Sequence, residues 1–396
     1  MRAPYFADEA SALYLGDCRE VLAELDAESI DAVVTDPPYG LGFMGREWDT
    51  FAPEAVAARR EANARKGTTA RTSERWPGKQ GQSQGGGVPI RYDESPEGHR
   101  RFRAWCEEWA REAFRVSKPG AALVAFGAPR TSHHLAIAIE GAGFEIRDTL
   151  AWLFGSGFPK HASALKPAWE PIILARRSLV GSIARNVEAY GTGALNVDAC
   201  RIPGPVDAYG TPAGRWPANV VLDEVAAAAV DAQAGERRVG RGELRREASI
   251  GHGGSAGSLA PGVGFGDSGG ASRFFYCAKA SKAEREAGLS ELPALVGVNG
   301  NTWMDRRYYP DGRVVETRAR RNTHPTVKPL DLMRWLVRLV TPAGGLVLDP
   351  FTGSGTTRLA ALAEGRRFVG VELNEEYLAI AAARRVQAGL GIEGVI

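Results

Sequence analysis

The four residues Asp36-Pro37-Pro38-Tyr39 place a carboxylate, two rigid prolines and an aromatic ring directly after an apolar segment, residues 30–35. An amino group on an aromatic ring is a poor nucleophile because its lone pair is delocalised into the ring. The Asp36 carboxylate and the Pro37 carbonyl can accept the hydrogens of such an amine and make its lone pair available. The proline rings hold that carbonyl rigidly, and Tyr39 can stack on the ring. A proline-terminated strand with a surface turn would show the same four residues, so the motif needs support from the rest of the chain.

A second motif joins an apolar segment to a predicted helix: Asp349-Pro350-Phe351-Thr352-Gly353-Ser354-Gly355. Glycines at such a turn let the backbone approach a ligand closely, with a helix N-terminus behind it. The turn is not a P-loop, because Thr356 follows Gly355 where a P-loop has Lys, and it lacks the third glycine of the dinucleotide fingerprint. Glu372 ends the next apolar segment about 20 positions on, where a carboxylate is placed to bind ribose hydroxyls. A plain tight turn and an ordinary strand-end carboxylate are the alternatives.

The elements that must position these motifs alternate between apolar and amphipathic segments, which predicts an α/β fold with a mainly parallel sheet. In such sheets ligands bind at the carboxyl ends of the strands, where both motifs lie. We expect strands at residues 12–15, 30–35, 121–126, 145–153, 169–175, 345–348 and 367–371. We expect helices at residues 21–25, 102–116, 132–142, 330–340, 356–364 and 375–388.

Two stretches depart from this alternation. Residues 53–95 contain almost no aliphatic cluster, and eight basic but only two acidic residues lie from Arg59 to Arg91, which predicts a mobile basic loop. Residues 176–322 are rich in Gly, Arg and Ser, and we interpret them as an irregular inserted module outside the sheet. This module contains two further arginine clusters, at residues 237–246 and 313–321.

The bulk composition excludes several classes of protein. Its four cysteines lie far apart without a C-x-x-C pair, and its histidines lack metal-ligand spacing, so we expect neither a disulfide framework nor a metal site. No apolar run approaches the roughly 20 residues of a membrane span, and the first residues lack the apolar core of a signal peptide. We therefore expect a cytoplasmic protein with no membrane partner. The formal net charge is only +2, so the distribution of charge matters more than its sum.

Taken together, the two motifs resemble those of the amino-methylating DNA methyltransferases, the N6-adenine/N4-cytosine family that uses S-adenosylmethionine. Asp-Pro-Pro-Tyr followed much later by Phe-x-Gly-x-Gly is similar to the permuted, beta-type arrangement of that family. In it the catalytic half precedes the cofactor half, and a target-recognition domain lies between them. Four further stretches agree with this resemblance: residues 16–17, 160–170, 324–329 and 369–374.

The resemblance implies a role for thirteen residues. The target base would be held by four of them: Asp36, Pro37, Pro38 and Tyr39. S-adenosylmethionine would be bound by Asp17, Asp36, Thr326, Lys328, Asp349, Phe351, Gly353, Gly355, Glu372 and Asn374, with Glu372 on the ribose hydroxyls.

The resemblance also implies the architecture. It is a Rossmann-like methyltransferase fold with a mostly parallel seven-stranded sheet, circularly permuted and interrupted by an irregular target-recognition region. The catalytic half would occupy residues 1–175, the target-recognition insert residues 176–322 and the cofactor half residues 323–396. The strands that lead to Asp17 and Asp36 would both adjoin the strand that leads to Asp349.

The implied activity is site-specific methylation of N6 of adenine in double-stranded DNA, with the base flipped out of the duplex. Basic segments would then contact phosphates. In this family Asp at position 36 favours adenine and Ser favours cytosine, so methylation of cytosine N4 is the first alternative. A catalytically silent DNA-binding module is an alternative of another class, and an RNA or protein methylase is a further one. The resemblance leaves a homodimer and a cognate restriction enzyme open as partners.

Overall fold

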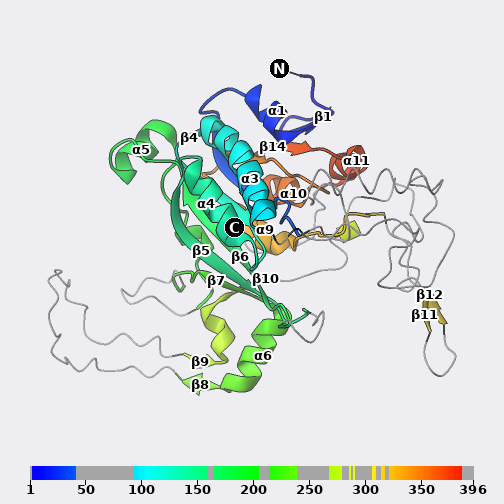
Figure 1. The fold of residues 1–396 in the computed structure, drawn as a ribbon. Helices are drawn as coiled ribbons and strands as arrows, with labels where there is room; N and C mark the ends of the chain where they lie inside the picture. The colour runs from blue at the N-terminus through cyan, green and yellow to red at the C-terminus, as the bar shows by residue number, and fades with distance from the viewer. Residues whose placement is uncertain are drawn as a thin grey trace.

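The computed structural model describes residues 2–41, 93, 95–157, 165–204, 214–238, 267–278, 285–286, 289, 306–308, 314–316 and 321–385. These residues form one large sheet with helices on both faces (Figure 1). The predicted basic loop at 53–95 lies outside the described residues except for Asp93 and Ser95. Among the described residues, no helix combines the length and the apolar character that a membrane span requires.

The sheet confirms the α/β prediction, because most neighbouring strands run parallel. Within the described part of this sheet, only the pairs β1–β2, β4–β6 and β6–β5 are antiparallel. The order is β1 (Phe6–Ala7), β2 (Ser11–Leu15), β14 (Arg367–Glu372), β13 (Leu346–Asp349), β3 (Ile30–Thr35), β4 (Ser117–Phe126), β6 (Trp169–Arg176), β5 (Glu145–Leu153), β7 (Val220–Asp223) and β10 (Tyr276–Ala278).

The sheet corrects two expectations. The seven predicted strands, from β2 to β5 in this order, are all present, but β7 and β10 extend the sheet with residues that we had placed in a module outside it. These two strands have only four and three residues, too few to show a periodic pattern. The strand that leads to Asp17 adjoins β14 and not the Asp349 strand, whereas the strand that leads to Asp36 does adjoin the Asp349 strand.

Helices on the two faces of the sheet bury separate apolar cores. Val33 packs in one core, and its neighbours Ala32 and Val34 pack in the other, because successive side chains of a strand point to opposite faces. Strands that are buried on both faces have nearly continuous apolar sequences, and the central strands of this sheet follow that pattern. The first core contains α1 (Cys18–Ala23), α3 (Pro96–Val116) and α4 (Ser132–Gly141), and the second contains α9 (Leu330–Val340), α10 (Thr356–Ala363) and α11 (Glu375–Ala383).

The region between the two halves is more regular than its composition suggests. It contains helices α5 (Ile183–Tyr190) and α6 (Glu224–Ala234), the 3-10 turns η4 (Asp198–Cys200) and η5 (Ala271–Phe274), and two short ladders. The ladders pair β8 (Arg237–Arg238) with β9 (Ser268–Gly269) and β11 (Arg306–Tyr308) with β12 (Val314–Glu316). In Figure 1, α6, β8 and β9 lie below β7 and β10.

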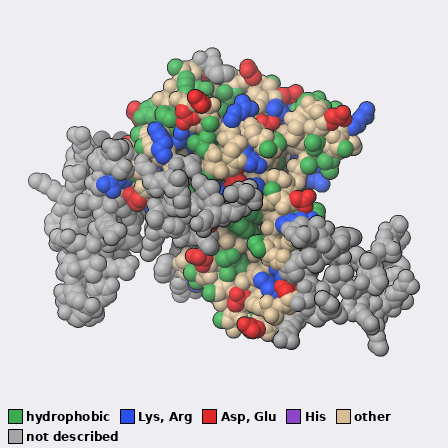
Figure 2. Space-filling model, turned by 180° about the vertical axis from the view of Figure 1, so that it is seen from behind, with side chains coloured by type: hydrophobic (Ala, Val, Ile, Leu, Met, Phe, Trp, Pro, Cys, Tyr) green, Lys and Arg blue, Asp and Glu red, His purple; other side chains and the backbone are tan. Residues whose placement is uncertain are grey.

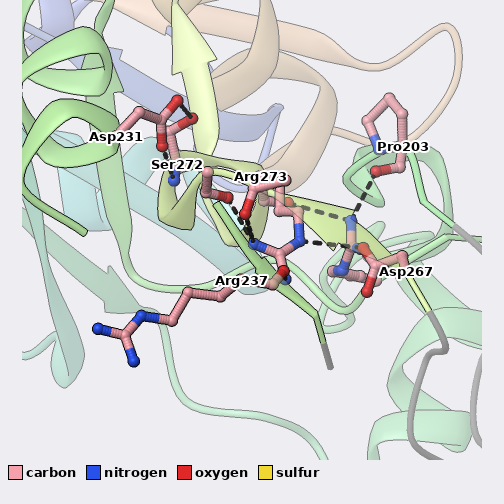
Figure 3. A network of polar contacts seen from close by, with 9 residues as sticks. Pro203, Asp231, Arg237, Asp267, Ser272 and Arg273 are labelled. Carbon is pink, nitrogen blue, oxygen red and sulfur yellow. Dashed lines mark hydrogen bonds and ion pairs between the residues drawn. The ribbon is translucent and has the colours of Figure 1, made fainter. Parts of the chain in front are cut away.

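Ion pairs and hydrogen bonds join pieces of this region (Figure 3). Asp267 accepts a hydrogen bond from Arg273 Nε at 3.0 Å and also pairs with the buried Arg215. Asp231 of α6 accepts hydrogen bonds from the backbone N and the Oγ of Ser272, at 2.7 and 2.6 Å. Such pairs give order to a segment that is rich in Gly and Arg.

One buried carboxylate, that of Asp349 at the end of β13, ties together the strands that carry the two motifs. Its Oδ1 accepts a hydrogen bond from Thr35 Oγ1 of β3, and its Oδ2 accepts one from Thr357 Oγ1 of α10, both at 2.6 Å. The backbone N of Phe351 donates to Oδ1 at 3.1 Å.

Burial raises the pKa of Asp349 to about 6, from an ordinary value of 3.8. A raised pKa means that folding disfavours the ionised form, so this group lowers stability as the pH rises from about 4 to about 6.

We expect Thr357→Val to destabilise the protein in a pH-dependent way. The substitution removes one of the two hydroxyls that stabilise the ionised Asp349, so the free energy of unfolding should fall by about 1–3 kcal/mol at about pH 8. The loss should be smaller at about pH 5, where Asp349 is mostly protonated. Urea unfolding at both pH values measures it. Thr352→Val is a matched control, because Thr352 Oγ1 donates to the backbone carbonyl of Asp349, which does not titrate; equal losses at both pH values for Thr357→Val would contradict this account.

Candidate active site

A cavity of 1520 Å³ opens at the carboxyl edge of the parallel strands. It brings both motifs together, because β3 and β13 are neighbours and end at the same edge. Twelve of the thirteen residues singled out from the sequence line it: Asp17, Asp36, Pro37, Pro38, Tyr39, Thr326, Lys328, Asp349, Phe351, Gly353, Glu372 and Asn374.

The thirteenth residue, Gly355, is not among those that line the cavity. It has φ +80° and lies at the N-cap of α10, where a Cβ would come within 2.9 Å of the Cβ of Ala381 in α11. Its glycine is therefore explained by a left-handed backbone and by close packing of two helices. The neighbouring Gly353 has φ +53° and does line the cavity.

Four polar side chains form a cluster at the Asp36 end of the cavity. Tyr39 donates its hydroxyl hydrogen to Asp36 Oδ1 at 2.7 Å, and the Lys328 ammonium lies 2.8 Å from Asp36 Oδ2. Glu170 Oε2 lies 3.3 Å from both the Tyr39 hydroxyl and the Lys328 Nζ. Although burial opposes the charged form, the two carboxylates raise the pKa of Lys328, and burial raises the pKa of Tyr39 well above its ordinary value. The cluster therefore holds a protonated lysine and a neutral phenol.

Glu170 is a residue that the sequence reasoning did not assign to the site. It lies at the start of β6, whereas the sequence pattern points to residues at the carboxyl ends of strands. Because β6 runs antiparallel to both of its neighbours, its first residues reach the edge at which the parallel strands end. Lys166 and Trp169-Glu170 belong to a stretch of the sequence that resembles the family, and this resemblance could have pointed to Glu170. The sequence does not reveal the direction in which the strand runs.

The backbone of the Asp36 motif is anchored from α4. The buried Thr131, at the N-cap of that helix, donates its hydroxyl hydrogen to the carbonyl of Tyr39 at 2.8 Å. Pro37 is buried, while Asp36 and Tyr39 are half-buried and face the cavity. The motif therefore has a fixed backbone and side chains that a ligand can reach.

Glu372 forms the other end of the cavity. Its Oε2 accepts a hydrogen bond from the backbone N of Gly353, and its Oε1 accepts one from the backbone N of Asn374, both at 2.8 Å. Burial raises the pKa of Glu372 to about 7. Each carboxylate oxygen keeps one lone pair, so the group can still accept hydrogen bonds from a ligand. The Asn374 side chain is occupied as the N-cap of α11, where it accepts from Glu376 N at 2.9 Å.

Aromatic and capping residues shape the remaining wall. Phe351 packs against Trp105 and Trp109, with ring centroids 5.4 Å apart in each pair. Asp17 caps α1 and is bound by Arg19, whose hydrogen bonds lower the pKa of that carboxyl. Thr326 lines the cavity from the segment before α9. Among the described residues, no group of three or more His, Cys, Asp or Glu side chains is placed to hold a metal ion.

Comparison with known proteins places this site in a family. The family model described as DNA methylase, of the N6/N4 type, matches residues 30–181 and 265–383. The type II methyltransferase M.HindIII of Haemophilus influenzae is 25% identical over 388 residues, which cover 96% of this chain and 95% of that protein. The DNA adenine methyltransferase YhdJ of Escherichia coli is 39% identical over 87 residues, 22% of this chain and 28% of that protein. Among solved structures, the cytosine-N4-specific PvuII DNA methyltransferase aligns with a TM-score of 0.47 at 15% identity, over 98% of this chain and 90% of that one. The chain belongs to the N6/N4 family of DNA methylases.

Proposed function

We propose that this DNA methyltransferase transfers the methyl group of S-adenosylmethionine to N6 of adenine in double-stranded DNA. The methyl donor is that of the family. The observation that carries the proposal is the position of Asp36 and Pro37 in the same cavity as Glu372 and the glycine turn. Adenine is supported by the Asp at position 36 and by the name of the relative YhdJ, a DNA adenine methyltransferase.

The residues of the Glu372 end fit the methyl donor. A carboxylate with free lone pairs suits ribose hydroxyls, and the aromatic ring of Phe351 suits an apolar or planar group. Ser354 Oγ is a buried hydroxyl that has no hydrogen-bond partner among the described residues, and Ser354 lines the cavity, so a polar ligand there would satisfy it. When bound, S-adenosylmethionine supplies a methyl group on a positively charged sulfur.

The residues of the Asp36 end would activate the amine. Asp36 and the Pro37 carbonyl each accept one hydrogen of the base amino group, which directs its lone pair at the methyl carbon. In the transfer, the N–C bond would form as the bond between the methyl carbon and sulfur breaks, and the sulfur would keep the electron pair and leave as a neutral thioether. Positive charge would build on the nitrogen, and the Asp36 carboxylate would stabilise it. The nitrogen then loses one proton, which Asp36 is placed to accept.

Access to the amine requires that the base leave the duplex, which costs a few kcal/mol. Phosphate contacts from basic residues would offset that cost. Figure 2 shows the face opposite to that of Figure 1, where Lys and Arg side chains are interspersed with Asp and Glu over the described surface. We propose that residues 176–322 and the basic segment at residues 53–95, which carry the three basic clusters of the sequence, recognise the target sequence.

Ligand affinity at the Glu372 end should depend on pH. The ionised Glu372 accepts hydrogen bonds from hydroxyls more strongly than the protonated acid, and its pKa of about 7 lies in the accessible range. 5′-Methylthioadenosine has the ribose hydroxyls and no group that titrates near neutral pH, which makes it the probe. Its affinity should fall by up to about tenfold per pH unit below pH 7.

Isothermal titration calorimetry of wild type and Glu372→Gln measures this dependence. The variant should bind the probe weakly at every pH, with no slope. A wild-type affinity that does not change with pH, or a slope that survives in Glu372→Gln, would contradict the proposed contact.

Asp36→Ala should lower the rate of methyl transfer at saturating methyl donor by about 10²-fold or more, because the carboxylate acts in the transition state. Tritiated methyl donor and genomic DNA give the rate, and digestion to nucleosides identifies the product. We expect N6-methyladenosine in its deoxy form. N4-methyldeoxycytidine would refute the base assignment, and near wild-type activity of Asp36→Ala would refute the mechanism.

A further inference from the structure

Glu170 and Asp36 share two hydrogen-bond donors, and they compete for the single hydrogen of the Tyr39 hydroxyl. The Tyr39 hydroxyl, which has one hydrogen, lies 2.7 Å from Asp36 Oδ1 and 3.3 Å from Glu170 Oε2. The Lys328 ammonium lies 2.8 Å from Asp36 Oδ2 and 3.3 Å from the same Glu170 oxygen. Both donors are therefore closer to Asp36 and within reach of Glu170.

In this arrangement, both oxygens of the Asp36 carboxylate already have hydrogen-bond or ion-pair partners when no base is bound. One oxygen of its carboxylate is bound by a hydroxyl and the other by an ammonium, so its charge is largely neutralised where the base amine needs a strong acceptor. If Tyr39 turned its hydroxyl hydrogen to Glu170, Asp36 Oδ1 would be free to accept from the amine. The movement required is small, because the two acceptor oxygens already flank the hydroxyl.

The charge of the cluster also depends on Glu170. Asp36 and Lys328 alone sum to zero, and Glu170 makes the set net negative. The side chains are only 20%, 9% and 23% exposed for Asp36, Lys328 and Glu170, so water screens these charges incompletely. A net negative cluster matches the positive charge that develops on the amine nitrogen during methyl transfer.

We propose that Glu170 is a positioning residue that takes over the Tyr39 hydroxyl and shares the Lys328 ammonium, so that Asp36 can bind the amine of the target base. The inference rests on the proposed role of Asp36. Among the described residues, the polar contacts of the Glu170 side chain are those to Tyr39 and Lys328. Its contacts are therefore with the groups that hold Asp36.

A double-mutant cycle tests the exchange. Single-turnover rates at saturating methyl donor and DNA are measured for wild type, Glu170→Gln, Tyr39→Phe and the double variant, with methyl-donor affinity and thermal stability as parallel readouts. Glu170→Gln should lower the rate about tenfold, the size of one charge-assisted hydrogen bond, with donor affinity within about twofold of wild type. In the Tyr39→Phe background no hydroxyl needs to move, so the same change should cost about threefold or less.

Glu145→Gln is the matched control. Glu145 also lies in the β5–β6 pair and is bound to an arginine, Arg176, at 2.7 Å, but it does not line the cavity. Its rate should equal that of wild type. If Glu170→Gln does not fold, Glu170→Asp enters the same cycle, because its carboxylate, on a side chain shorter by one carbon, would lie farther from the Tyr39 hydroxyl.

The outcomes separate this inference from the proposed function. The exchange would be overturned if Glu170→Gln lowered the rate equally with and without the Tyr39 hydroxyl, or did not lower it at all. In that case an inactive Asp36→Ala would still support the role of Asp36. Near wild-type activity of Asp36→Ala would overturn the role of Asp36, and the exchange with it.

Discussion

The buried Asp349 carboxylate is the interaction on which the site depends. Its hydrogen bond to Thr35 joins residues 314 positions apart and fixes the end of β3 beside the end of β13. Asp36 follows Thr35 directly, and the glycine turn follows Asp349. One buried acceptor therefore sets the position of Asp36 relative to the glycine turn. Its hydrogen bond to Thr357 adds the first turn of α10 to the same unit.

The two ends of the cavity differ in how they hold charge. At one end, the Glu372 carboxylate is bound by backbone amides, which are neutral donors, and burial raises its pKa to about 7. At the other end, Asp36 and Glu170 share an ammonium and a phenol. In the proposed reaction, methyl transfer would move positive charge from sulfur to the amine nitrogen, beside Asp36 and Glu170. A net negative cluster at that end would lower the energy of this charge.

Much of this was predictable from local pattern. Apolar runs bounded by Asp-Pro or Gly-rich turns predict the seven central strands and the residues that end them. Twelve of the thirteen residues singled out from the sequence line one cavity. Strand order and direction were harder, because they depend on pairing between distant segments. The strand that leads to Asp17 proved to lie beyond β14, and Glu170 was missed because β6 runs antiparallel. The short strands β7 and β10 have too few residues for a pattern, and Gly355 serves helix packing that no local signal reveals.

The most direct test of the account is a crystal structure of the protein bound to a duplex that contains its target site and to sinefungin, a stable analogue of the methyl donor. We predict that the analogue's ribose hydroxyls lie within hydrogen-bond distance of the Glu372 carboxylate. We also predict a flipped adenine whose amino group lies within that distance of Asp36 and the Pro37 carbonyl. An amino group held by other residues, or a ribose bound away from Glu372, would contradict it.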